Sequence, residues 1–325
     1  MTELLKRLML TTGVSGREEK IREAIKAEVL PYADEVSVDP VGNLIARKKG
    51  NGKKIMLCSH MDEIGFFASF IEDSGIIRVS TVGGIMPVAS AYTEVVSESG
   101  VRGVLVADNE KDAPKAENLY IDIGAKTKKQ AEKHVRLGDY FVCAPVMRKL
   151  LGTRYIGRPF DDRVGCAIMI EALKQLKETE NDLYFVFSVQ EEVGARGSKP
   201  VSYAIAPDIG IAFDVTMTGD KPGGPTMAVK LGDGCAIKIK DSGVICHPEL
   251  VKSMREIAKE GSVKYQNEVL LAGGTDASSM QVAGRGAQAG VISIPCAFIH
   301  TGVEMIDMAD VKEAVKLTVL LCEKL

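Results

Sequence analysis

The chain has 325 residues, enough for one large domain or two ordinary ones with a sizeable core. Hydrophobic residues make up 46% of it and charged residues 26%, a composition typical of globular proteins and not of disordered ones. The net charge of −3 argues against bulk attraction to nucleic acid or anionic membranes, and no apolar run approaches the length of a bilayer-crossing helix.

The first sixty residues predict two helices followed by three strands. Ser15-Gly16-Arg17-Glu18 matches the capping-box pattern, and Ile21, Ile25 and Val29 follow it at helical spacing. The expected elements are a helix before Thr11, a helix from the box to about Leu30, a hairpin of strands at 35–38 and 44–47, and a strand at 53–58.

Between about Phe67 and Arg154 the character of the chain changes. Short β-type runs alternate with turn residues there, and only Lys128–His134 suggests a helix. These runs cover residues 75–81, 93–97, 101–106 and 140–145. We therefore expect a small β-rich domain over residues 67–154, inserted into one α/β domain made of residues 1–66 and 155–325.

Strands and helices alternate again after residue 155, which predicts an α/β fold for the outer portions. An aromatic and β-branched run from Asp182 predicts a buried strand that ends before the adjacent carboxylates Glu191 and Glu192. Further strands are expected at 209–213, 226–230, 235–240, 289–294 and 296–299, and helices at 163–177, 248–260 and 309–323, with a short one after 273–276.

The cysteines give an expectation about the compartment. None of the seven forms a Cys-x-x-Cys pair, and most lie in apolar contexts, where reduced packing in a core is the expected role. The N-terminus also lacks the layout of a secretory signal. A cytoplasmic protein is therefore expected.

Ionisable residues gather at the predicted ends of strands. They are His60 and Asp62 after one strand, Glu191 and Glu192 after another, Asp214 after a third and His300 after a fourth, with Asp161 and Asp162 before a helix. Each has an ordinary alternative, such as a solvated pair, a helix cap or a satisfied core histidine. Because ligands collect outside the carboxyl ends of strands in open α/β sheets, their coincidence favours one metal site. Mixed histidine and carboxylate ligands suit zinc, cobalt or manganese better than calcium.

The motifs around these residues carry a family resemblance. They are His60–Phe66, Phe160–Gly165, Gln190–Gly197, Asp214 and His300–Gly302. In order and spacing the chain resembles the TET-type dinuclear metalloaminopeptidases, which are glutamyl or deblocking aminopeptidase-like members of the co-catalytic zinc exopeptidase group. The resemblance covers essentially the whole chain. It implies a mixed-sheet α/β catalytic domain carrying an inserted β-barrel-like domain.

The resemblance also implies a ligand set and a reaction. Two divalent metal ions per subunit, zinc or cobalt, would be held by Asp161 as the bridge, by His60 and Asp214 on one side, and by Glu192 and His300 on the other. Asp62 would orient and polarise His60, Asp162 would hold the backbone of the bridging residue, and Glu191 would be the general base. The implied activity is removal of N-terminal residues from short peptides by a metal-activated water. The family further implies a homo-oligomer built from dimers, often of twelve subunits, with the insert contributing to contacts and substrate access.

Other functions remain open on the residues alone. Paired carboxylates are the signature of glycoside hydrolases, and some relatives carry endoglucanase labels, but that chemistry gives no reason for His60 and His300. A purely structural metal site in a scaffold protein would have no need for Glu191. Gly274, Thr275 and Asp276, before the short helix, are either a plain turn and N-cap or a candidate place where backbone amides and a carboxylate meet substrate.

Overall fold

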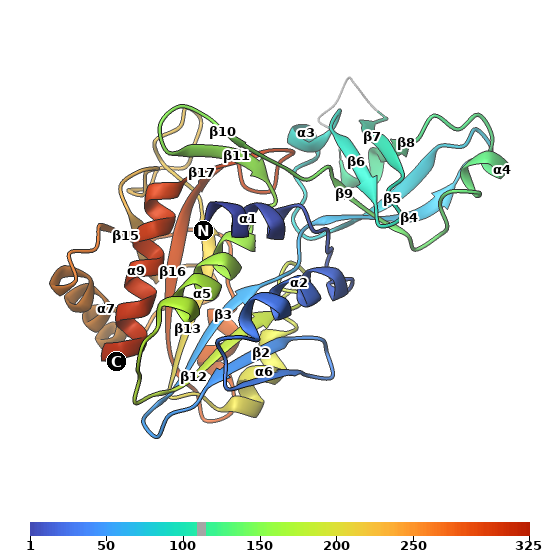
Figure 1. The fold of residues 1–325 in the computed structure, drawn as a ribbon. Helices are drawn as coiled ribbons and strands as arrows, with labels where there is room; N and C mark the ends of the chain where they lie inside the picture. The colour runs from blue at the N-terminus through green and yellow to red at the C-terminus, as the bar shows by residue number, and fades with distance from the viewer. Residues whose placement is uncertain (109–114) are drawn as a thin grey trace.

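The computed structural model of the chain describes residues 1–108 and 115–325 and divides them into two parts (Figure 1). One part is an eleven-stranded mixed sheet with helices on both faces, and the other is a closed barrel of six strands. The barrel projects from one end of the sheet part. The predicted fold class, a mixed α/β domain with a separate small barrel, is confirmed. No helix in these described ranges has the length and apolar character that a membrane crossing requires.

The centre of the sheet consists of four parallel strands. They are β12 (Asp182–Ser188), β3 (Lys54–His60), β13 (Ile209–Thr216) and β16 (Gln288–Ala297), in that order. Antiparallel strands extend one side as β2 (Leu44–Lys48) and β1 (Glu35–Val38), and the other as β17 (Glu304–Asp307), β11 (Arg154–Arg158) and β10 (Val146–Lys149). β14 (Cys235–Lys240) pairs with β16 and with β15 (Tyr265–Val269). The carboxyl ends of the four parallel strands therefore meet at one edge.

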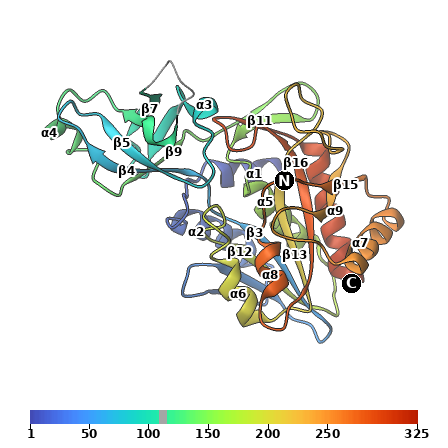
Figure 2. The same ribbon diagram turned by 180° about the vertical axis from the view of Figure 1, so that it is seen from behind.

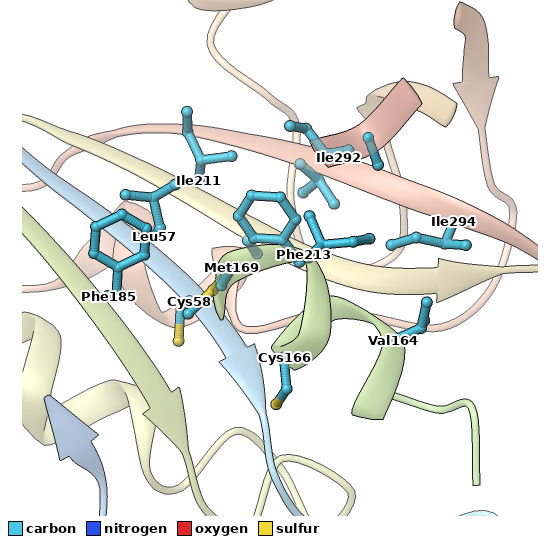
Figure 3. Packing of buried hydrophobic residues seen from close by; sticks show 14 of the residues in the cluster. Leu57, Cys58, Val164, Cys166, Met169, Phe185, Ile211, Phe213, Ile292 and Ile294 are labelled. Atoms are coloured by element: carbon cyan, nitrogen blue, oxygen red, sulfur yellow. The ribbon is translucent and has the colours of Figure 1, made fainter. Parts of the chain in front are cut away.

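Helices sandwich this sheet. One face carries α1 (Thr2–Met9), α2 (Glu19–Val29), α5 (Arg163–Gln175), α7 (Pro248–Glu260) and α9 (Met308–Lys324), and the other carries α6 (Ser198–Ile205) and α8 (Ala277–Val282) (Figures 1 and 2). Figure 3 shows Val164 and Met169 of α5 among Leu57, Phe213 and Ile292 of the central strands, all of them buried. Each such side chain stabilises the fold by about 1.5–3 kcal/mol relative to an exposed one. This packing fixes the position of α5 and of its N-cap residue, Asp162.

The barrel has its own apolar interior. Its strands are β4 (Gly65–Ile71), β5 (Ile77–Val82), β6 (Glu94–Ser97), β7 (Arg102–Ala107), β8 (Leu119–Asp122) and β9 (Tyr140–Cys143), closed in the order β4-β5-β8-β7-β6-β9. The short elements α3 (Pro87–Ser90), η1 (Ala116–Asn118) and α4 (Lys128–Ala131) connect them. Phe66, Leu105, Ile121 and Phe141 are buried inside. Closure leaves no exposed strand edge in the barrel.

Several expected elements differ from those observed. The strand expected at 226–230 is wrong: Val229 is buried there, but the backbone of Lys230 bonds to the Gln266 side chain and not to a neighbouring strand. The two strands expected at 289–294 and 296–299 are one strand, β16, which runs through Pro295 and ends at Ala297. The helix expected at 128–134 ends at Ala131. β10 lies inside the stretch expected as the insert, yet it pairs with β11 in the large sheet.

The expected capping box before α2 is also wrong. The hydroxyl of Ser15 donates to Asp62 at 2.6 Å, and α2 begins at Glu19 without a side-chain cap. Glu18 accepts hydrogen bonds from the backbone N–H groups of Gly16 and Gln190 at 2.7 and 3.1 Å. Tertiary contacts have thus taken both side chains that the local pattern assigned to the helix start.

Candidate metal centre

The ionisable residues singled out in the sequence meet at the carboxyl edge of the central strands. His60 ends β3, Asp214 lies near the end of β13, and Glu191 and Glu192 follow β12. Asp161 precedes α5, and His300 lies three residues beyond the end of β16. The arrangement follows from the parallel register, in which Ser188 of β12 lies opposite His60.

Their side chains form two groups of potential ligand atoms that share Asp161. In the first group, Nε2 of His60 lies 3.2 Å from Oδ1 of Asp161 and 3.9 Å from Oδ1 of Asp214. In the second group, Nε2 of His300 lies 3.1 Å from Oδ2 of Asp161 and 3.3 Å from Oε2 of Glu192. Within each group all ligand atoms lie within 4.8 Å of one another. One carboxylate therefore presents one oxygen to each group.

These groups have the charge and the unpaired atoms that divalent cations would satisfy. Oδ1 of Asp161 and Oε1 of Glu192 are buried without a hydrogen-bond partner in the described part of the chain. Leaving such an oxygen unpaired costs about 1–3 kcal/mol, and more for a charged group. Burial raises the pKa of Asp214 and Glu191 well above the ordinary range, with the neighbouring Asp161 contributing at Asp214. The residues present therefore fit a pair of divalent cations.

The histidines supply positive charge when no cation is present. Although burial favours the neutral ring, contacts with Asp161 and Glu192 raise the pKa of His300 to about 11. Burial also opposes charge on Asp161, but His300 and His60 hold the pKa of that carboxyl below its usual range. Metal binding at either group would displace these protons.

Asp62 connects the first group to the Glu191–Glu192 segment. Nδ1 of His60 lies 3.1 Å from the carbonyl oxygen of Asp62 and 3.4 Å from its carboxylate. The carboxylate accepts hydrogen bonds from the N–H groups of Glu191 and Glu192 at 3.0 and 3.2 Å, and from the hydroxyl of Ser15. Asp62 therefore holds both the imidazole ring and the backbone of the paired glutamates.

Asp162 fixes the segment that carries Asp161. Its carboxylate caps α5 by accepting a hydrogen bond from the N–H of Gly165, and it accepts another from the hydroxyl of Ser59 on β3. The peptide bond between Asp161 and Asp162 is cis. Burial raises the pKa of Asp162 to about 8.

Two buried residues that the sequence did not indicate complete this support. Glu304 accepts from the N–H groups of Phe160 and Asp161 and forms an ion pair with Arg158 at 3.3 Å. Arg158 also donates to the carbonyl oxygen of Thr301, next to His300. Neither residue belongs to a motif, and both lie on strands whose pairing is long-range, so no local signal could have found them.

Gly83 and Gly84 lie against the second group. A Cβ at Gly84 would lie 2.8 Å from Nδ1 of His300. A Cβ at Gly83 would lie 2.4 Å from the side chain of Ile64 and 3.1 Å from Oε2 of Glu192, and its φ is +74°. These positions need glycine because the barrel segment approaches the ligand side chains closely.

A cavity of about 460 Å³ opens beside the two groups, and His60, Asp161, Glu191, Glu192, Asp214 and His300 all line it. Glu191 and Gly274 also line a second cavity of about 410 Å³, which includes Thr275. Asp276 lies beneath these walls: it is 2% exposed and accepts from Cys58 and Ser188. Of the three candidate substrate-contacting residues, Gly274 thus lines both cavities, Thr275 lines the second although it is itself only 2% exposed, and Asp276 lines neither.

Comparison with known proteins defines the class. A family model described as M42 glutamyl aminopeptidase matches residues 42–317. The lysyl aminopeptidase of Pyrococcus furiosus is 36% identical over 338 residues, covering 99% of this chain and 97% of its own. Aminopeptidase APDkam598 of Desulfurococcus kamchatkensis superposes with a TM-score of 0.96 at 37% identity, covering 99% of this chain and 94% of that one. The chain therefore belongs to the aminopeptidases, a class of hydrolases that act on peptide bonds. The chain belongs to the M42 glutamyl aminopeptidase family, and its predicted resemblance to TET-type aminopeptidases is confirmed.

Two further solved structures bear on assembly and on the competing function. The TET1 peptidase of Pyrococcus horikoshii, described as assembling into a tetrahedron or a large octahedral shell, matches with a TM-score of 0.89 at 34% identity over 100% of this chain and 99% of that one. A Thermotoga maritima protein described as an endoglucanase matches with a TM-score of 0.84 at 33% identity, over 98% of this chain and 96% of its own.

Proposed function

We propose that this chain is a dinuclear metal-dependent aminopeptidase that removes N-terminal residues from short peptides. The observation that carries the proposal is the sharing of Asp161 by two groups of ligand atoms, with Glu191 on the wall of the same cavity. Asp161 would contribute to both ions, His60 and Asp214 to one, and Glu192 and His300 to the other. Zinc or cobalt suits this donor set.

When bound, such ions supply Lewis acidity, which polarises a carbonyl group and makes water more acidic. Glu191 accepts the proton of the attacking water and returns it to the departing amine as the carbon–nitrogen bond breaks. Burial raises the pKa of Glu191 well above its ordinary range, which makes this carboxylate a stronger proton acceptor than an exposed one. Asp62 positions Glu191 by accepting its backbone N–H.

The cavity supports action at a chain end. Its volume of about 460 Å³ accommodates one amino-acid residue beside the ligand groups. The surrounding carboxylates attract the ammonium group of a peptide N-terminus. Glu191, shared by the two cavities, lies where the N-terminal residue would part from the remainder of the peptide.

The same proposal covers the organisation of the chain. The large sheet with its helices, to which β10 also belongs although it lies within residues 67–154, forms the catalytic domain, and the barrel contributes to subunit contacts and substrate access. A dimer-based homo-oligomer, up to a dodecamer, is supported by the assembling TET1 relative and by large exposed apolar side chains such as Leu151 and Tyr203. A cytoplasmic location is supported by the seven cysteines, all of them free.

Metal-stripped protein assayed on aminoacyl p-nitroanilides, before and after addition of single cations, tests the proposal. Activity should vanish with EDTA and return with Zn²⁺ or Co²⁺. Hydrolysis of a β-glucan that persists in EDTA would instead support the glycoside hydrolase suggested by the Thermotoga relative's description. Bound metal without hydrolysis of either substrate would favour a structural site.

A further inference from the structure

The cavity beside the candidate metal centre has a wall that can distinguish N-terminal side chains. Outside the ionisable residues, its lining includes Met86, Val215, Met217, Leu270, Ala272 and Ile299. These side chains come from four separate segments: the turn before α3, the end of β13, the stretch after β15 and the residue before His300. The part of the cavity that does not face the ligand groups is therefore apolar.

This wall offers no charge to a charged substrate side chain. In the described ranges 1–108 and 115–325, no lysine or arginine lines the cavity, and its carboxylates are the proposed ligands and Glu191. A glutamyl side chain would enter without a cation to pair with. A lysyl side chain would lose its hydration with no carboxylate beyond those already engaged. Burying an unpaired charge is strongly unfavourable.

The structure behind the wall adds to this discrimination. The hydroxyl of Thr216, a lining residue, donates to Glu268 at 2.7 Å, so its proton is not available for a hydrogen bond to a substrate carboxylate. Lys238 is 1% exposed and already paired with Glu268 at 3.1 Å and Asp241 at 3.2 Å. One ammonium group thus faces two carboxylates, so this buried cluster has a net negative charge, which disfavours a glutamyl side chain nearby.

We propose that this cavity selects peptides whose N-terminal side chain is apolar and uncharged, such as leucine or methionine, over glutamyl and lysyl peptides. The inference rests on the proposed aminopeptidase function. It separates this chain from the glutamyl specificity in the description of its family and from the lysyl specificity of its Pyrococcus furiosus relative.

A panel of p-nitroanilides of leucine, methionine, alanine, glutamate and lysine, assayed on the metal-loaded full chain, tests the inference. We expect kcat/KM for leucine or methionine to exceed that for glutamate and lysine by at least about tenfold, since contacts in such pockets are worth about 10–200-fold. A preference for glutamate or lysine would overturn it. A lysine preference would point to Glu268, whose Oε2 has no hydrogen-bond partner among the described residues.

Charge-introducing variants test the wall directly. Met217→Lys should raise the glutamate-to-leucine ratio of kcat/KM, and Met217→Glu should raise the lysine-to-leucine ratio. Leu30→Lys, at a surface position 58% exposed and outside the cavity, is the matched control and should leave both ratios unchanged. Unchanged ratios in folded Met217 variants would remove this residue from the specificity wall. If no amide is cleaved by wild-type protein after cation addition, the proposed function fails, and with it the inference.

Discussion

Glu191 is the residue on which the proposed chemistry depends most directly. It lines both cavities and belongs to neither group of ligand atoms. Glu191→Gln preserves its size and removes its ability to accept a proton. We therefore expect hydrolysis of leucine p-nitroanilide to fall by about 10²–10⁴-fold, with metal content by atomic absorption unchanged. Full activity in this variant would refute the role of Glu191, and loss of metal would move it into the ligand set.

Glu18 provides a second prediction at the scale of a single residue. Burial, with Asp62 nearby, raises the pKa of Glu18 from 4.5 to about 7. Because the folded state binds this proton more tightly than the unfolded state, the favourable contribution is complete below pH 4.5 and is lost as the pH rises through about 7. One oxygen, Oε1, accepts both of its backbone hydrogen bonds, so glutamine can retain them.

Glu18→Gln should therefore match wild type in stability near pH 5 and exceed it at pH 8 by up to about 3 kcal/mol. Urea unfolding at the two pH values measures the difference. Glu19→Gln, one residue along on an exposed position of α2, is the control and should show no such change between the two values. An equal effect of Glu18→Gln at both pH values would show that the variant acts through packing and not through the proton.

At the scale of elements, the barrel segment before α3 is in contact with the second ligand group. Gly84→Ala would place a methyl group 2.8 Å from the His300 ring, which must then move. We expect metal affinity to fall by about 10–100-fold, as it does when the support of a ligand is removed, with little change in Tm. Isothermal titration with Zn²⁺ measures this. Gly274→Ala, where an added Cβ meets nothing within 4 Å, should bind metal as wild type does.

Elements whose signals are local could be predicted from the sequence. The apolar run that begins at Asp182 and the apolar side of α5 correctly predicted a strand and a helix. Glu191, Glu192 and Asp161 next to their ends therefore lie close together. Contacts between distant segments could not be predicted in this way. β17 is four residues long, and its Glu304 can support the segment before α5 only because β17 pairs with β11, which carries Arg158. The hydroxyl of Ser15 likewise follows a tertiary partner, Asp62, and not the local capping pattern.

The whole molecule brings the five proposed ligand side chains together from β3, β13, the segment after β12, the segment before α5 and the segment after β16. In the absence of cations, the fold holds their carboxylates close together at a cost in free energy. Because the groups are assembled only in the folded chain, a cation that binds them stabilises the fold by mass action, by about 2.7 kcal/mol at one hundred times its Kd. Thermal unfolding should therefore shift upward by several degrees when Zn²⁺ or Co²⁺ is added to stripped protein.

Variants of Glu191 and Asp161 separate stabilisation by the cation from catalysis. Glu191→Gln keeps every proposed ligand atom, so its Tm should rise with the cation as much as that of wild type. Asp161→Ala removes the carboxylate shared by both groups, so its Tm should no longer respond. Val282→Ala, at an exposed position on α8, should retain the full response. A cation response that survives in Asp161→Ala would mean that the ions bind elsewhere, and the shared carboxylate would then not be the centre of the site.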